Sequence, residues 1–311
     1  MQQVIMMTER RKEYSHVSQI RFDGDISIRT VYPTLRINLL GTFLIASDHI
    51  PLASIEVPRL QSLLAYLVLH RGAPQSRTHL ASMLWPDSKE EQAHTNLRNL
   101  LYKLRQALPD SDLYLVVNRH MLMWQNNDFW TMDVLEFERA VNMSKQAESM
   151  ENQAMLRRAL EKALELYRGD LLPGCYDEWI LQERERLSQM YLEVLEKLLC
   201  MQEKEGDFPG AIRIAHRLLR EDPLQEESYR HLMRLYAASG NRAAAVRVYQ
   251  NCVAALEREL AVEPGPETRR VYEQLTHSEH LRPFTVLQRS GSGVVTFETA
   301  RSKHYSLSEC C

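Results

Sequence analysis

The sequence has little of what marks several large classes of protein. Its five cysteines show no CxxC or CxxxC spacing, which argues against a disulfide framework. No stretch approaches the length of a transmembrane helix. The N-terminal segment MQQVIMMTERRKEYSH turns polar before the apolar core of a signal peptide could form. We therefore expect reduced thiols and a cytoplasmic protein that does not contact a membrane.

Motifs of common enzymes are missing as well. The sequence contains no GxxxxGK[ST] loop, no GxGxxG after a strand, no HExxH and no GxSxG. The histidines and cysteines do not supply four ligands at zinc spacing. Cys175, between Gly174 and Tyr176, is interpreted as an ordinary thiol. We expect no enzymatic activity, no cofactor and no metal.

Charge of one sign is not in excess. The chain has 38 Lys and Arg against 41 Asp and Glu, a net charge of −3, so any surface for a polyanion must be local. With 311 residues, 44% of them hydrophobic, the chain can bury sizeable cores, and roughly two domains are expected.

The segment from Ser88 to Leu108 is the most informative stretch. Ser88 is expected to cap a helix, and Glu91 to complete a capping box. An apolar stripe follows at helical spacing: Ala93, Leu97, Leu100, Leu101, Leu104 and Leu108. The opposite face holds Gln92, Thr95, Asn99, Tyr102, Lys103 and Gln106, with Arg98 and Arg105 on one flank. No acidic residue lies between Glu91 and Asp110. We predict a DNA recognition helix.

The flanking segments predict a winged helix over residues 34–131. Strands are expected in LRINLLGTFLI, with a turn or bulge at Gly41, and near Ile50 to Leu52. A helix should begin at Pro58 and end before Gly72. A short helix capped by Ser76 should stop at Trp85-Pro86, and a three- or four-residue turn would join it to the recognition helix. LYLVVNRHMLMW predicts a hairpin with Asn118-Arg119-His120 at its tip.

The second half predicts helices throughout. A long helix is expected from about Glu178 to Lys204. EGDFPGAIRIA (205–215) and SGNRAAAVRVY (239–249) align at an offset of 34 residues, which is the tetratricopeptide period. We assign residues 132–276 to this helical repeat domain, residues 1–33 to a flexible leader and residues 277–311 to a tail that lacks amphipathic period. Whether the tail folds stays open.

Together these motifs resemble the SARP-type bacterial transcriptional regulators, in which an OmpR-like winged helix precedes a bacterial transcriptional activator domain of tetratricopeptide type. The similarity covers about residues 35–276. It rests on motifs of both domains in the right order: LRINLLGTF, SRTHLASMLWPD, NLRNLLYKLRQAL, WTMDVLEFERAV, LRRALEKALELYRGDLLPG, DPLQEESYRHLMRLYAASGNRAAAVRVY and LERELAVEPGPET.

The resemblance implies a mainly α protein, with an N-terminal winged helix-turn-helix of α+β type and an all-α repeat domain. It implies an activator that binds promoter direct repeats in double-stranded DNA as a homodimer and contacts RNA polymerase, through its sigma factor. The sequence shows neither the receiver domain of OmpR relatives nor the nucleotide-binding domain of larger SARP members, so the control of its activity stays open.

The candidate DNA contacts combine the polar helix face with the hairpin tip: Thr95, Arg98, Asn99, Tyr102, Lys103, Arg105, Gln106, Arg119 and His120. The cations would mostly neutralise phosphates. Asn99, Gln106 and Thr95 have the chemistry to read adenine edges or a thymine methyl, and which of them does so stays open. Arg119 is placed to enter a minor groove or meet a phosphate.

Two other interpretations remain. The winged helix of an interaction adaptor would bind protein instead of DNA. Alternatively, the chain is the N-terminal portion of a larger signalling regulator without DNA binding of its own. For the repeat domain, a structural spacer, a dimer scaffold and a groove for a peptide are all open.

Overall fold

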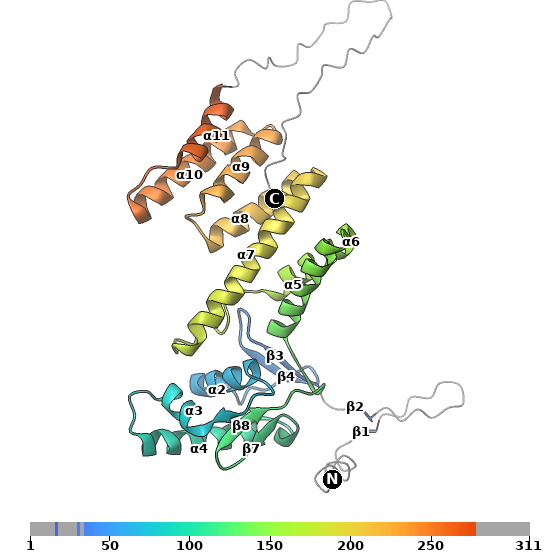
Figure 1. Ribbon diagram of the computed structural model, residues 1–311, viewed down its shortest axis with the longest axis vertical. Coiled ribbons are helices and arrows are strands. Elements are labelled where there is room, and N and C mark those ends of the chain that lie inside the picture. The colour runs from blue at the N-terminus through green and yellow to red at the C-terminus, as the bar shows by residue number, and fades with distance from the viewer. Residues whose placement is uncertain (1–15, 18–29, 32–33, 278–311) are drawn as a thin grey trace, which may run out of the picture. The chain divides into compact units, whose positions relative to one another are not determined.

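The computed structural model describes residues 16–17, 30–31 and 34–277 (Figure 1). The chain forms two compact units, residues 1–191 and 192–311, here called the first and second units. Most of the expected leader, and the expected tail beyond residue 277, lie outside the described residues. Within the leader, β1 (His16–Val17) pairs antiparallel with β2 (Thr30–Val31).

The first unit begins with a sheet in the order β5-β4-β3-β9. Its strands are β3 (Leu35–Asn38), β4 (Leu44–Ser47), β5 (Ile50–Pro51) and β9 (Trp130–Met132). The turn expected at Gly41 lies between antiparallel β3 and β4, and the short strand expected near Ile50 is confirmed. β9 was not predicted. It pairs parallel with β3 and so joins the two ends of the winged helix.

Three helices and a second sheet complete the winged helix. The helices are α2 (Pro58–Leu69), α3 (Arg77–Leu84) and α4 (Glu90–Ala107). The sheet has the order β6-β8-β7, with β6 (Gln75–Ser76), β7 (Leu115–Val117) and β8 (Met121–Trp124). The predicted hairpin is thus β7–β8, and β6 is a third strand that the sequence pattern did not indicate.

Aromatic side chains fill the space beneath this sheet. Trp124 is fully buried, stacks on Tyr114 at a centroid distance of 5.8 Å and meets Trp130 edge-on at 6.1 Å. These residues serve packing, because none of the three rings is exposed.

The predicted cap of α4 is wrong. The helix begins at Glu90 with Lys89 in the cap position, and no side chain caps it. The N–H of Ser88 donates to the Trp85 carbonyl at 3.2 Å, so Ser88 belongs to the preceding turn instead of the helix. The capping box with Glu91 therefore does not form, and residues 85–89 separate α3 from α4 in place of a three- or four-residue turn.

Ser76 does occupy the cap position of α3, but its side chain makes no capping hydrogen bond. It is also the last residue of β6 and pairs with Met121 of β8. Ser76 is therefore both the last residue of β6 and the residue that precedes α3. Pro58, by contrast, lies in the first turn of α2 as predicted.

The rest of the first unit is a helical hairpin and the beginning of a long helix. α5 (Asp133–Ser149) follows β9 directly, α6 (Gln153–Leu166) packs against it, and α7 (Trp179–Glu205) starts after a loop. The Asp133 carboxylate accepts hydrogen bonds from the N–H groups of Leu39 and Leu40 at 2.9 Å. The first turn of α5 thereby satisfies the backbone at the end of β3.

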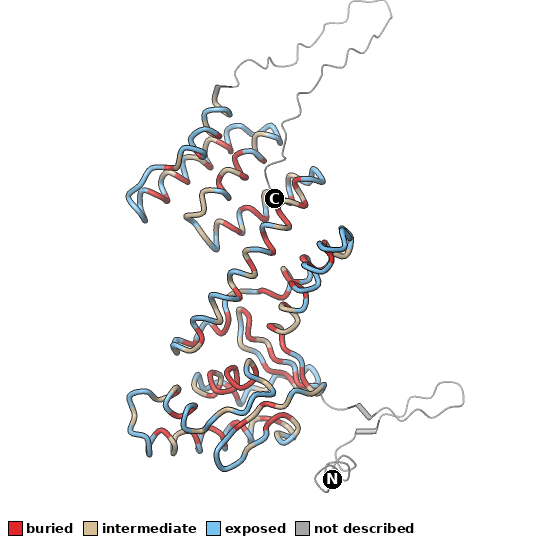
Figure 2. Tube along the Cα trace, in the orientation of Figure 1, coloured by how far each residue is buried: buried red, intermediate tan, exposed pale blue. Residues whose placement is uncertain are grey.

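In its described residues, the second unit contains the end of α7 and four further helices, which confirm the 34-residue repeat. These are α8 (Phe208–Glu221), α9 (Glu226–Ala238), α10 (Arg242–Leu260) and α11 (Pro266–His277). Asp207 caps α8 and Asn241 caps α10, each accepting the N–H three residues ahead. Buried and exposed positions alternate along these helices (Figure 2).

Two glycines hold equivalent turns of this repeat. Gly206 has φ +76° and Gly240 has φ +78°, a conformation that glycine adopts without the steric cost of a side chain. The repeat seen in the sequence is therefore a repeat of local structure, with a glycine turn followed by a capped helix.

Candidate nucleic-acid interface

Helix α4 buries one side and exposes the other. The predicted stripe is confirmed, because its members are at most 6% exposed: Ala93, Leu97, Leu100, Leu101, Leu104 and Leu108. The predicted polar residues of the helix are all exposed: Thr95, Arg98, Asn99, Tyr102, Lys103, Arg105 and Gln106. We call these seven the α4 polar face. The apolar stripe packs the helix onto α2 and α3 and so holds this face toward solvent.

The cations of the α4 polar face differ in their surroundings. Arg98 and Lys103 form no ion pair within the described residues. Arg105 donates to Asp112 at 2.9 Å, and both side chains are substantially exposed. An exposed pair of this kind contributes roughly 0–1 kcal/mol, so Arg105 can exchange its carboxylate for another anion at little cost.

The neutral side chains offer directional groups. Thr95 is exposed, and its hydroxyl donates to the Glu91 carbonyl at 2.9 Å. The amides of Asn99 and Gln106 have no hydrogen-bond partner in the described part of the protein, so both can donate and accept in a complex. Tyr102 is 68% exposed, which leaves a ring and a hydroxyl free for contact.

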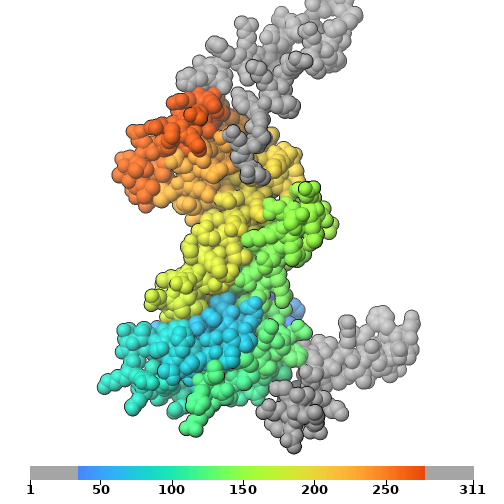
Figure 3. All heavy atoms as spheres, in the orientation of Figure 1, coloured from blue at the N-terminus to red at the C-terminus, as the bar shows by residue number. Residues whose placement is uncertain are grey.

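The β7–β8 hairpin supplies a second exposed element. Its tip is closed by Asn118, whose side-chain oxygen accepts from the N–H groups of His120 at 3.0 Å and Met121 at 2.7 Å. Arg119 and His120 are both exposed, as the sequence predicts for a tip. In the space-filling view, α4 and this hairpin both lie at the surface of the first unit (Figure 3).

Arg77 ties the hairpin tip to helix α3, and the sequence pattern gave no sign of it. Its backbone N–H donates to the His120 carbonyl at 2.9 Å. Its guanidinium donates to the Asn118 carbonyl at 3.2 Å. The partners lie about forty positions apart in sequence, so no local period indicates the contact. One residue thus links the start of α3 to the loop that presents Arg119.

The loop before α7 holds helix α2 through a polar cluster. Asp177 accepts from the Ser62 hydroxyl at 2.5 Å and forms an ion pair with Arg59. Burial acts to raise the pKa of Asp177, but these hydrogen bonds and the Arg59 charge outweigh it and hold the pKa below its ordinary value. Burial raises the pKa of the nearby Cys175 thiol, which favours the unreactive form.

An aromatic contact strengthens the same junction. Trp179 meets Tyr66 of α2 edge-on at a centroid distance of 5.1 Å, and its indole N–H donates to Ser62 at 3.3 Å. The Tyr66 hydroxyl lies 3.1 Å from the ring of His79 in α3. Trp179 at the start of α7 therefore contacts α2, and α2 in turn contacts α3, so these contacts help to hold the helices that pack beneath the α4 polar face.

Among the described residues, no group of three or more His, Cys, Asp or Glu side chains could hold a metal ion. None of the helices in this part of the protein combines the length and apolar character needed to cross a membrane.

Comparison with known proteins gives a family for the second half. Residues 132–276 match the bacterial transcriptional activator domain. The chain is 26% identical to the regulatory protein AfsR of Streptomyces coelicolor over 245 residues, which cover 79% of this chain and 24% of AfsR. It is 26% identical to the transcriptional regulatory protein MoaR1 of Mycobacterium tuberculosis over 260 residues, 81% of this chain and 79% of MoaR1.

A solved structure supports the fold. Mycobacterium tuberculosis EmbR, determined in complex with a low-affinity phosphopeptide, has a TM-score of 0.64 at 22% identity, over 80% of this chain and 67% of EmbR. The chain spans about a quarter of the length of the AfsR relatives. Residues 132–276 therefore form a bacterial transcriptional activator domain, and the chain as a whole is similar to transcriptional regulators of the SARP type.

Proposed function

We propose that this chain is a sequence-specific activator that binds promoter direct repeats in double-stranded DNA through its winged helix. The observation that carries the proposal is the α4 polar face, which is exposed along the helix and holds no acidic residue. An amphipathic helix with such a face fits the major groove, where a helix can reach base edges. Transcriptional regulators among the relatives support the same role.

The residues divide by chemistry. Arg98 and Lys103 contact phosphates, and Arg105 joins them by exchanging Asp112 for a phosphate oxygen. Asn99 and Gln106 carry amides that match adenine edges, and the methyl group of Thr95 can meet that of thymine.

The aromatic and hairpin residues complete the interface. Tyr102 extends the contact on α4 through its ring and hydroxyl. Arg119 enters the neighbouring minor groove or meets its phosphates, with His120 beside it. Because only a few cations are available, one copy binds weakly, and a second copy on the adjacent repeat makes the complex stable.

The helical repeats serve protein contacts in this proposal. Repeat domains present extended surfaces and commonly work by binding other proteins. Here they contact the second copy on DNA or RNA polymerase, through its sigma factor. The activity is placed in the cytoplasm, where the promoter DNA of a bacterium lies.

An electrophoretic shift titration on genomic fragments tests DNA binding. The double substitution Arg98→Ala with Lys103→Ala should weaken binding roughly tenfold or more, and should lower the slope of log affinity against log salt by about 2, one for each lost phosphate contact. The matched control is Arg234→Ala with Arg247→Ala, which removes the same charge from exposed positions of the second unit.

The outcomes separate the interpretations. Binding to a discrete site that the control retains and the α4 variant loses supports the proposal. If the affinity depends neither on the DNA sequence nor on the α4 substitutions, the proposal is overturned. The interpretation as an adaptor whose winged helix binds protein would then be favoured.

A further inference from the structure

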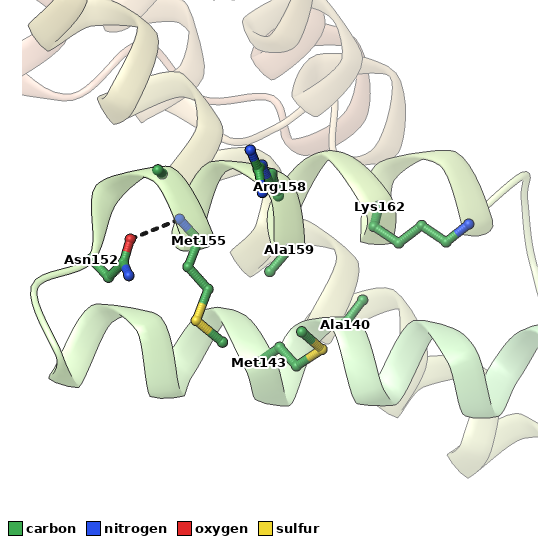
Figure 4. A pocket seen from close by; sticks show the side chains of 8 residues that line it. Ala140, Met143, Asn152, Met155, Arg158, Ala159 and Lys162 are labelled. Atoms are coloured by element: carbon green, nitrogen blue, oxygen red, sulfur yellow. Dashed lines mark hydrogen bonds between the residues drawn. The ribbon is translucent and has the colours of Figure 1, made fainter.

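An apolar groove with basic side chains runs between α5 and α6 in the first unit (Figure 4). Its volume is about 470 Å³. Eight residues line it: Ala140, Met143, Asn152, Ala154, Met155, Arg158, Ala159 and Lys162. The side chain of Met155 extends from α6 toward α5, and Met143 lies on α5 at the gap between the helices, with Ala140 and Ala159 nearby. Small residues therefore keep the groove open, and thioethers form its floor.

The groove between α5 and α6 leaves apolar surface exposed to solvent. Among the lining residues, Met143 is 46% exposed. Large apolar side chains gathered on one surface mark sites of protein contact more often than isolated ones do. Methionine is flexible and polarisable, so it adapts to different apolar partners.

The charge of the groove selects the partner. None of the eight lining residues is acidic. Arg158 is exposed and forms no ion pair within the described residues. Lys162 lies 3.9 Å from Glu165, and both side chains are more than half exposed, so this pair is weak. The two cations lie one helical turn apart on α6, next to the methionine floor.

We infer that this groove binds an acidic amphipathic helix of a partner protein. Its apolar side chains would contact Met143 and Met155, and its carboxylates would pair with Arg158 and Lys162. From Asn152 to Lys162 the groove extends about 15 Å, which matches about three turns of a helix. An apolar face in a groove with charges along one side is a common mode of helix recognition. This inference deepens the proposed function, since it assigns a partner chemistry to the activator domain.

The binding test uses the full chain and a synthetic probe. The probe is a fluorescein-labelled helical peptide with leucine and phenylalanine at i, i+3, i+4 and i+7 and glutamate elsewhere. Fluorescence anisotropy should show saturable binding that weakens with salt. A peptide with glutamine in place of glutamate should bind about tenfold more weakly, because it lacks the charge.

Charge exchange gives the sharpest control. The variant Arg158→Glu with Lys162→Glu should lose the glutamate peptide and gain binding to a lysine peptide of the same apolar pattern. Met143→Gln with Met155→Gln should weaken both forms of binding. Arg234→Glu with Arg247→Glu, in the second unit, should leave them unchanged. Circular dichroism confirms that each variant is folded.

Three results would overturn the inference: glutamate and glutamine peptides that bind equally, charge-reversed protein that keeps its preference for glutamate, or a control that behaves like the groove variant. Light scattering measures the oligomeric state of each variant. If the groove substitutions change the oligomeric state while the peptide fails to bind, the occupant is a second copy and the inference is wrong. DNA binding does not enter this test, so its failure and that of the proposed function are distinguishable.

Discussion

The carboxylate of Asp177 accepts a 2.5 Å hydrogen bond from the hydroxyl of Ser62, which lies 115 positions earlier in the chain. The contact joins the loop before α7 to helix α2. Helix α2 packs against both α3 and α4. The loop that contains Asp177 therefore helps to hold in place the helices that carry the candidate interface.

Asp177→Asn should lower the free energy of unfolding of the first unit by about 1–3 kcal/mol at neutral pH, because it removes the charge from a part-buried hydrogen-bonded cluster. The pKa of Asp177 lies below its ordinary value of 3.8 when folded. Its charge therefore stabilises the protein above pH 3.8, and this contribution is lost as the pH falls through the folded pKa.

Urea titrations at several pH values measure this effect. The difference between wild type and Asp177→Asn should shrink as the pH falls below 3.8. The neighbouring exposed Glu178 serves as control, and Glu178→Gln should have little effect throughout. A difference that is independent of pH would show that the charge of Asp177 is not what stabilises the junction.

Gly41→Ala should destabilise the first unit more than Gly240→Ala destabilises the second. Both glycines have positive φ, near +80°, which costs an alanine about 1 kcal/mol. At Gly41 the added Cβ would also lie 2.7 Å from the Arg168 carbonyl oxygen, whereas at Gly240 no atom lies within 4 Å. Thermal unfolding of the two variants compares them.

Gly174→Ala provides the baseline for this pair, because that position has neither positive φ nor a neighbour within 4 Å of the added Cβ. Equal losses at Gly41 and Gly240 would mean that the Arg168 backbone moves away at no cost.

Asn241→Ala should cost about 1 kcal/mol, because it removes the side chain that caps α10. Asp207→Ala should cost a similar amount at α8. Ser88→Ala should be nearly neutral, since Ser88 caps no helix. Denaturant unfolding distinguishes these cases. If Ser88→Ala lowered the free energy of unfolding as much as Asn241→Ala, Ser88 would cap α4 in solution after all.

Arg77→Ala should loosen the hairpin tip without unfolding the winged helix. It removes one hydrogen bond to the Asn118 carbonyl while the backbone bond to His120 remains. Amide exchange at His120 and Met121 should therefore accelerate, and Arg77→Lys should restore part of the protection. Unchanged exchange in Arg77→Ala would show that β6–β8 pairing alone holds the tip.

Local periodicity predicted the helices well. The stripe from Ala93 to Leu108 is buried as expected, because side chains at i, i+3 and i+4 share a face in any α-helix. The 34-residue repeat was also predicted, from the alignment of residues 205–215 with residues 239–249, whereas the caps of α8 and α10 were not. All nine predicted DNA contacts lie at exposed positions. Their contact with DNA stays a prediction.

Contacts between distant segments could not be predicted. β6 and β9 are two or three residues long, too short for an alternating pattern, and each forms only because a partner strand lies beside it. The link from Arg77 to Asn118, 41 positions apart, depends on the same tertiary arrangement. Ser88 had the right chemistry for a cap, but its backbone was already part of a turn.

The parallel pairing of β9 with β3 has a consequence for synthesis. β3 leaves the ribosome well before its partner Trp130–Met132, which emerges only after the rest of the winged helix has been made. Closing so long a loop carries an entropic cost, so the sheet is completed late. A nascent chain or a truncation that stops before Trp130 would leave one edge of β3 open to pairing with another molecule.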